Sequence, residues 1–175
     1  EGVLIRSSID LSETGLRYVT FDSAWGIPQY ISTVGEFRYG ALVLDGASPT
    51  LTELEFNQIN TSSVLTTNLA QPTFNGGNFV VGSDASKSIV GAALQIYSSG
   101  SSVSPFTLSD ISLIGTENGC GPRDGGRATI WAQDSFIEID NAQIISGDYG
   151  IGLYTSAGRV TNTAINVNCN GIDLN

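Results

Sequence analysis

Histidine and methionine are absent from this chain of 175 residues, and Lys87 is its only lysine. Without histidine the chain lacks the most frequent general base and the most frequent metal ligand, which excludes a Ser-His-Asp triad and most zinc chemistry. No apolar run approaches the roughly 20 residues that a helix needs to cross a bilayer. The sequence therefore predicts no membrane insertion and leaves carboxylates and arginine as the residues to test for catalysis.

Basic residues are scarce, since seven lysine and arginine residues stand against 17 aspartate and glutamate residues, for a formal net charge of −10. Nucleic-acid binding depends on clustered lysine and arginine, and attraction to anionic membrane surfaces depends on the same residues. The charge argues against both kinds of partner. An acidic surface of this kind is typical of a soluble exported protein.

The end of the chain repeats itself with a period of 21 residues. Residues 150–153 (GIGL) recur in similar form as residues 171–174 (GIDL). Residues 139–144 (IDNAQI) likewise resemble residues 160–165 (VTNTAI). Two different short patterns with one period indicate a repeat architecture, in which each unit buries its apolar face by stacking on the next.

The same unit occurs less regularly upstream. Residues 51–57 (LTELEFN) carry apolar side chains at the first, fourth and sixth places, and residues 16–22 and 108–113 fit the same pattern. The pattern predicts two stacks of inward side chains: Leu16, Leu51, Leu108, Ile139 and Val160 in one, and Phe21, Phe56, Leu113, Ile144 and Ile165 in the other. Short alternating runs precede each copy and predict a further strand at residues 3–5, 40–44, 91–96, 126–130 and 150–153.

The corners between these strands favour a coil over an antiparallel sandwich. A sandwich needs hairpin turns of two to five residues with Asn-Gly or Asp-Gly signals, whereas residues 45–49 (DGASP) and 155–158 (TSAG) are suited to bend a strand into a new sheet. Stacking strand on strand then gives parallel pairing, and chirality favours right-handed connections. We expect an all-β chain that forms a right-handed parallel β-helix (β-solenoid) of about five to six rungs with long loop insertions.

Residues 40–57 (GALVLDGASPTLTELEFN) resemble a rung of the right-handed parallel β-helix of the pectate-lyase-like superfold. This family includes lyases, hydrolases, phage tailspikes, adhesins and surface-layer modules, so the resemblance implies architecture more than activity. It implies an extracellular setting and often a carbohydrate partner.

Three segments interrupt the period and are expected to be loop insertions, at about residues 22–39, 60–88 and 115–126. The first carries Trp25 and Tyr30, whose flat rings either stack on sugar rings or close the side of the coil. The second contains Asn60, the acceptor of an N-glycosylation sequon (Asn-Thr-Ser).

The third segment gives two readings. Glu117 and Asp124 are candidate ligands of a surface Ca²⁺ ion, which prefers oxygen ligands, although no EF-hand spacing and no nine-residue calcium repeat is present. The resemblance to lyases also implies a proton-abstracting arginine, for which Arg123 and Arg127 are the candidates. We expect no resident cofactor and treat Ca²⁺ as the alternative.

Paired carboxylates are the remaining catalytic possibility, since hydrolases place two of them close together. Asp110 and Asp140 fall at neighbouring places in successive copies. These places are also the polar corners of the repeat, where Asp110, Asn141 and Asn162 are expected to hydrogen-bond along the stack. We interpret the carboxylates as structural.

The chain contains two cysteines, Cys120 and Cys169. In an exported protein they predict one disulfide, and in a cytosolic protein they would be buried thiols. Their registers lie about two rungs apart, roughly 9–10 Å along the axis, so a bridge requires the segment at 115–126 to fold over the later rungs.

These observations predict one β-helix module over residues 1–175, expected to be a fragment of a longer chain. Its expected role is that of a non-catalytic structural or adhesive part of an exported cell-surface or virion-surface protein. Its partners would be neighbouring subunits, the continuation of the same chain, or glycans. The alternative is a carbohydrate-active enzyme, either a polysaccharide lyase or a glycoside hydrolase, or a glycan-binding module on the same fold.

Overall fold

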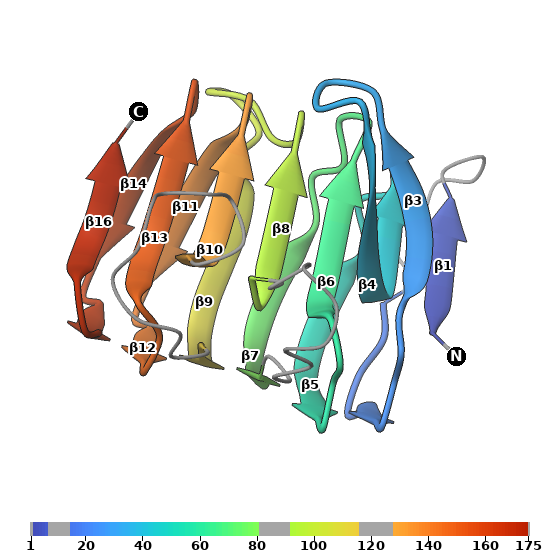
Figure 1. Cartoon of the computed structure of the whole chain (residues 1–175), viewed down its shortest axis with the longest axis horizontal. Coiled ribbons are helices and arrows are strands. Elements are labelled where there is room, and N and C mark those ends of the chain that lie inside the picture. Colours follow the sequence, from blue (N-terminus) through green and yellow to red (C-terminus); the bar gives the residue numbers. More distant parts are fainter. Residues whose placement is uncertain (1, 7–14, 81–91, 116–127, 175) are drawn as a thin grey trace.

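The computed structural model describes residues 2–6, 15–80, 92–115 and 128–174, and the regular structure in these ranges consists of β-strands arranged in two sheets (Figure 1). Nearly all neighbouring strands run parallel, as the repeat predicts. Within the same ranges, no helix is long and apolar enough to cross a membrane.

The first sheet is a single row of parallel strands that follows the order of the chain. Its register confirms the 21-residue repeat, because Ile130 pairs with Ile151 and Ile151 pairs with Ile172. The row consists of β1 (Val3–Arg6), β4 (Glu36–Asp45), β6 (Ser62–Thr67), β8 (Leu94–Tyr97), β10 (Ala128–Gln133), β13 (Tyr149–Tyr154) and β16 (Asn170–Leu174).

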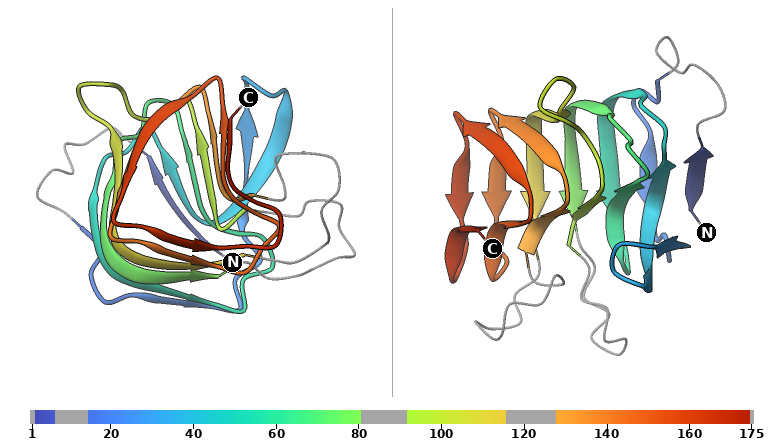
Figure 2. Two further views of the ribbon diagram at one scale, coloured as in Figure 1. Left: turned by 90° about the vertical axis from the view of Figure 1, so that its left-hand side faces the viewer. Right: turned by 90° about the horizontal axis from the view of Figure 1, so that it is seen from above.

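The second sheet is also parallel, and the chain enters it after each visit to the first (Figure 2). Its strands are β2 (Thr20–Asp22), β5 (Thr50–Asn57), β7 (Thr73–Val80), β9 (Phe106–Ile114), β11 (Phe136–Asp140), β12 (Gln143–Ile145), β14 (Ala157–Thr161) and β15 (Ala164–Asn166). Because β9 pairs with β11 through its first half and with β12 through its second half, the sheet has two faces that meet at a corner.

A column of residues with positive φ marks this corner, and we call it the corner column. It consists of Tyr18, Glu53, Gly76, Asp110, Asn141 and Asn162, one from each passage of the chain, with φ between 49° and 73°. Asn and Asp tolerate this left-handed conformation better than other residues that carry a side chain. The polar corners found in the sequence are therefore the bends of the second sheet.

The two predicted inward stacks are confirmed. Leu51, Leu108 and Ile139 are at most 1% exposed, and the strand register aligns them. In the second stack Phe56 is fully buried between Phe21 and Phe79, with ring centroids 4.6 Å and 5.2 Å away. The core therefore lies between the two sheets.

The expectation of a loop at about residues 60–88 is wrong for its first part, because β6 and β7 form a complete further passage through both sheets. The strand β6 was not predicted because its residues read as polar. Ser62, Ser63 and Thr66 are nevertheless fully buried, and their hydroxyls take part in hydrogen bonds with neighbouring groups. Residues 81–88 lie outside the described ranges.

The segment at about residues 22–39 contains an antiparallel hairpin, formed by β3 (Ile27–Ile31) and the start of β4. The hairpin covers part of the outer surface of the first sheet. Ile31 is 1% exposed and packs with Val43, Leu65 and Tyr97 in an apolar cluster separate from the main core.

Candidate functional site

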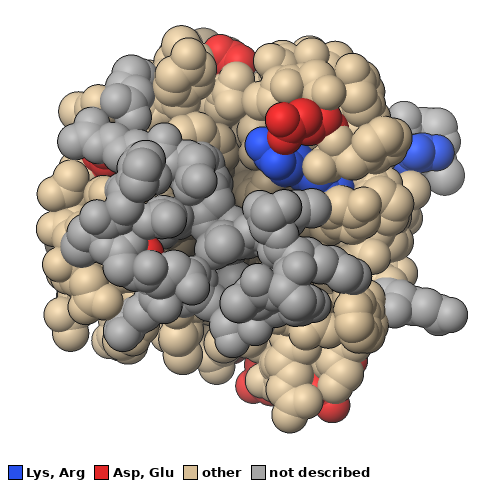
Figure 3. Space-filling view, viewed as in Figure 1, with Lys and Arg blue, Asp and Glu red and all other residues tan. Residues whose placement is uncertain are grey.

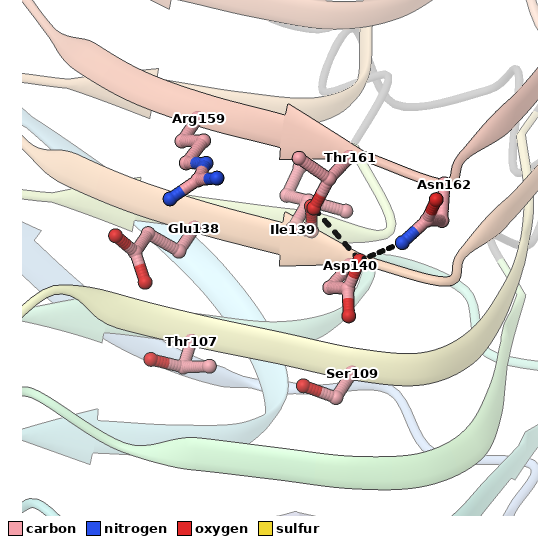
Figure 4. Close-up of a pocket in the computed structure, with 8 residues that line it drawn as sticks. All are labelled: Thr107, Ser109, Glu138, Ile139, Asp140, Arg159, Thr161 and Asn162. Carbon is pink, nitrogen blue, oxygen red and sulfur yellow. Dashed lines mark hydrogen bonds between the residues drawn. The ribbon is translucent and has the colours of Figure 1, made fainter.

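A polar groove of about 470 Å³ lies on the outer surface of the second sheet, on the part that precedes the corner in each passage of the chain (Figure 4). We call it the β9–β11–β14 groove after the three strands that form it. It is lined by Thr107, Ser109, Glu138, Ile139, Asp140, Arg159, Thr161 and Asn162.

The alternation of the three strands explains why the polar side chains of this lining face outward. Leu108 and Ile139 belong to the core, so the residues on either side of each must point away from it. The strand register then aligns Thr107, Glu138 and Arg159 in one outward row and Ser109, Asp140 and Thr161 in a second. The side chains of Thr107 and Ser109 on β9 are shorter than those of Glu138 and Asp140, their partners on β11.

Asp140 is held by hydrogen bonds from the next passage of the chain. Thr161 Oγ1 donates to Asp140 Oδ1 over 2.7 Å, and Asn162 Nδ2 donates to the same oxygen over 2.9 Å. These two bonds lower the pKa of Asp140 below its usual value, with smaller contributions from the backbone N–H of Asn141 and from the nearby Arg159 guanidinium. Asp140 is therefore a carboxylate at neutral pH with a fixed orientation, and it is poorly suited to act as a general acid.

Glu138 and Arg159 occupy paired positions on β11 and β14, but no ion pair within 4 Å joins them in the described structure. Neither side chain has a hydrogen-bond partner among the described residues. Among the described residues, the groove thus presents a Glu138 carboxylate and an Arg159 guanidinium without an ion pair on adjacent strands, and the guanidinium lies near enough to Asp140 to affect its pKa.

Asp110 lies in the corner column rather than beside Asp140. Asn141 Nδ2 donates to Asp110 Oδ1 over 2.5 Å, so the predicted hydrogen bonding along the stack is confirmed at Asp110, Asn141 and Asn162. A second hollow, of about 360 Å³, lies on the other side of this corner. It is lined by Glu53, Gly77, Asn78, Asp110, Ile111, Ser112, Asn141 and Gln143.

The two predicted sugar-stacking residues are exposed, Trp25 to 56% and Tyr30 to 52%. The ring of Tyr30 meets the ring of Phe37 edge-on across the hairpin, with centroids 5.3 Å apart. Exposure is compatible with a role in stacking, and that role stays a prediction.

The outer surface of the first sheet contains a buried polar network beneath the hairpin. Arg38 Nε donates to the Tyr97 hydroxyl (3.3 Å), the hydroxyl donates to Gln95 Oε1 (3.1 Å), and Gln95 Nε2 donates to Ser62 Oγ (2.5 Å). Burial raises the pKa of Tyr97, and the positive charge of Arg38 partly offsets this effect. Described charged side chains are otherwise sparse on this side (Figure 3), where Arg38 also pairs with Glu36 at 2.8 Å.

The glycosylation sequon lies at the start of β6. Asn60 is half-buried, and Ser62, whose hydroxyl completes the sequon, is fully buried and hydrogen-bonded to Gln95. Modification would therefore have to precede folding of this strand. Glycosylation at Asn60 stays a prediction.

The remaining predicted site residues cluster in the third insertion and lie outside the described ranges, so the calcium, arginine and disulfide hypotheses stay predictions. Cys169 is described and lies between the last two strands, where its N–H donates to the carbonyl of Asp148. Within the described ranges, no group of three potential metal-ligating residues is present. The residues outside these ranges are Glu117, Cys120, Arg123, Asp124 and Arg127.

The groove residues were not recognised as a site from the sequence. Thr107, Glu138 and Arg159 are far apart in the chain and come together only through the strand register. The alternation within residues 106–109, 136–140 and 157–161 was the available signal, because it marks the outward positions.

No protein-family model matches the chain, and neither the curated proteins nor the solved structures give a significant match.

Proposed function

We propose that the chain is a right-handed parallel β-helix module with a structural or adhesive role, and that it is not an enzyme. Its setting would be the surface of an exported cell-surface or virion-surface protein. Two observations support the β-helix. The chain alternates between two parallel sheets, and the corner column contains one residue from each of six passages.

The main support for a non-catalytic role is that Asp110 and Asp140 hydrogen-bond within the stack of strands. Asp110 accepts a hydrogen bond from Asn141, and Asp140 accepts bonds from Thr161 and Asn162, so both link one passage of the chain to the next. The lowered pKa of Asp140 makes it unsuited to be the proton donor of a hydrolytic pair. The two groups act as fixed acceptors that stabilise the stack.

The hairpin that covers part of the outer surface of the first sheet supports the same proposal. Ile31 packs on Val43 and Leu65 and buries them. The polar side chains of Tyr97 and Gln95 beside this cluster are hydrogen-bonded to each other. A substrate could reach this part of the sheet only if the hairpin moved away. Buried area is used here for stability rather than for access.

The proposed partners are neighbouring subunits, the continuation of the chain, or glycans, in an extracellular location. The net charge of −10 argues against nucleic acid. We propose no resident cofactor, with Ca²⁺ as the alternative. The second candidate function is glycan binding, which the β9–β11–β14 groove favours because it is polar and because Glu138 and Arg159 form no ion pair among the described residues.

Catalysis can be tested with the purified chain. Polygalacturonate and a set of neutral polysaccharides should yield neither new reducing ends nor unsaturated products, with an active lyase and an active hydrolase as assay controls. Turnover that is lost in Asp140→Asn would overturn the proposal. Antibodies against the chain should label the outer surface of the intact source cell or particle, and labelling confined to the cytoplasm would contradict the proposed location.

A further inference from the structure

The β9–β11–β14 groove combines features that its structural role does not explain. The hydrogen bonds along the stack use only one oxygen of Asp140, because Thr161 and Asn162 both donate to Oδ1. No described side chain donates to Asp140 Oδ2, so this oxygen can accept from a ligand while the bonds to Oδ1 and the backbone N–H of Asn141 hold the carboxyl in place. A fixed acceptor of this kind binds a ligand without a further loss of side-chain freedom.

Glu138 and Arg159 add unsatisfied groups of opposite sign to the same surface. They stand on adjacent strands at paired positions and have no ion pair or hydrogen bond within the described structure. Even if the two side chains formed an exposed ion pair, that pair would stabilise the fold only weakly. Stability therefore does not explain why Glu138 and Arg159 occupy paired positions. Both can turn toward a bound molecule in the groove, on the side where Figure 4 shows them.

The outward groups form a grid of two rows on three strands. The strands are about 4.8 Å apart, and side chains two places apart on one strand are roughly 6.5–7 Å apart. Thr107 and Ser109 contribute hydroxyls that both donate and accept, Glu138 accepts only, and Arg159 donates only. These spacings are comparable with the dimensions of a single pyranose ring.

The chemistry of the grid selects among ligand classes. An inorganic anion would face two carboxylates, and a lone cation would face the guanidinium of Arg159. Among the described residues that line the groove there is no aromatic ring, and Ile139 is the single apolar residue, so a largely apolar ligand gains little. A molecule with many closely spaced hydroxyls can supply donors to the carboxylates and acceptors to the guanidinium at once.

We infer that the β9–β11–β14 groove is a binding site for a neutral oligosaccharide, with Glu138, Asp140, Arg159 and Ser109 as its principal contacts. This inference rests on the adhesive role proposed above and names the ligand class for it. The volume of about 470 Å³ is within the range of small-molecule sites. Without a stacking ring the affinity of one site is weak, so several copies side by side would be needed for firm adhesion.

The test is saturation-transfer NMR and calorimetry on the folded chain with cellotriose, maltotriose and N,N′,N″-triacetylchitotriose, with trigalacturonate as the anionic comparison. At least one neutral trisaccharide should bind at millimolar concentration, and trigalacturonate should bind more weakly. Glu138→Gln and Arg159→Gln should each weaken binding about tenfold. Absence of binding by all three neutral probes would overturn the inference, as would preferential binding of trigalacturonate.

Strand β9 offers a matched pair of blocking variants. Ser109→Trp fills this groove, whereas Ser112→Trp places the same side chain in the hollow across the corner. Binding should be lost in the first and kept in the second, and circular dichroism should show both folded. Equal binding by both variants would overturn the site, and if Ser109→Trp does not fold, Glu138→Gln and Arg159→Gln decide the question.

The outcome also separates this inference from the proposed function. Binding followed by cleavage of the trisaccharide would support the site and refute the non-catalytic role. No binding and no cleavage would refute the site and leave the structural role in place.

Discussion

Asp140 shows how a single exposed side chain can connect two passages of the chain. Its hydrogen bonds from Thr161 and Asn162 exist only in the folded state, and they lower its pKa there. A carboxyl with a lowered pKa in the folded state stabilises the protein above its unfolded pKa, near 3.9. That stability is lost as the pH falls through the folded pKa.

We therefore predict that Thr161→Val and Asn162→Ala each raise the pKa of Asp140, measured by NMR titration of the side-chain carboxyl. In Asp140→Asn the melting temperature should fall at neutral pH and approach that of the wild type as the pH falls below about 4. A pKa that does not change in either variant would mean that these hydrogen bonds do not form in solution.

At the scale of the strands, the central feature is a column of stacked rings in the second half of the second sheet. Phe56 on β5 lies between Phe21 and Phe79, at interplanar angles of 6° and 26°. Its side chain is completely buried, so its removal leaves a cavity that the flanking strands can fill only in part.

Phe56→Ala should reduce the free energy of unfolding by about 3–5 kcal/mol, measured by chemical denaturation. Glu55→Ala is the matched control, because Glu55 is the exposed neighbour on the same strand and its loss should change stability by less than about 0.5 kcal/mol. A loss below about 1 kcal/mol for Phe56→Ala would contradict its place in the core.

The strands also show what the sequence could and could not predict. The strands β10, β13 and β16 were predicted because their alternating apolar residues recur, every 21 residues from β10 onward. Strand β6 was missed because its fully buried Ser62 and Thr66 look like loop residues, and only hydrogen bonds with other passages make their burial favourable. The hairpin of β3 and β4 was expected only as an insertion.

The candidate site was less accessible to prediction than the core. An inward stack repeats one kind of residue, so it can be recognised from periodicity alone. The groove instead combines different residues, such as Ser109, Glu138 and Arg159, whose proximity depends on the register of three strands. Sequence reasoning reached the role of Asp140 in the stack but not the free groups beside it.

At the scale of the whole molecule, a covalent link between distant parts of the stack is predicted by the two cysteines. Oxidised protein should show no free thiol under denaturing conditions, and reduction should lower the melting temperature because the bridge would close a loop of about 50 residues. Ellman titration of freshly isolated protein measures this directly, with a reduced sample as control. Two titratable thiols would rule out the pairing of Cys120 with Cys169.

The central feature of the architecture is that each passage of the chain lies in parallel register on the passage before it. Thr52 pairs with Asn75, and Asn75 pairs with Ser109, on three successive strands of the second sheet. Cα atoms of such partners are roughly 4.8 Å apart, within the range of a disulfide. Thr50 pairs with Thr73 rather than with Asn75. The Cα atoms of Thr50 and Asn75 are therefore roughly 8 Å apart, which is beyond the range of a disulfide.

Cysteine pairs introduced at these positions test the claim most directly, with each cross-link mapped by mass spectrometry of the digested protein. The account predicts that Thr52→Cys with Asn75→Cys, and Asn75→Cys with Ser109→Cys, each form an intramolecular disulfide, while Thr50→Cys with Asn75→Cys does not. Failure of both in-register pairs, or efficient bridging of the out-of-register pair, would contradict the parallel stack.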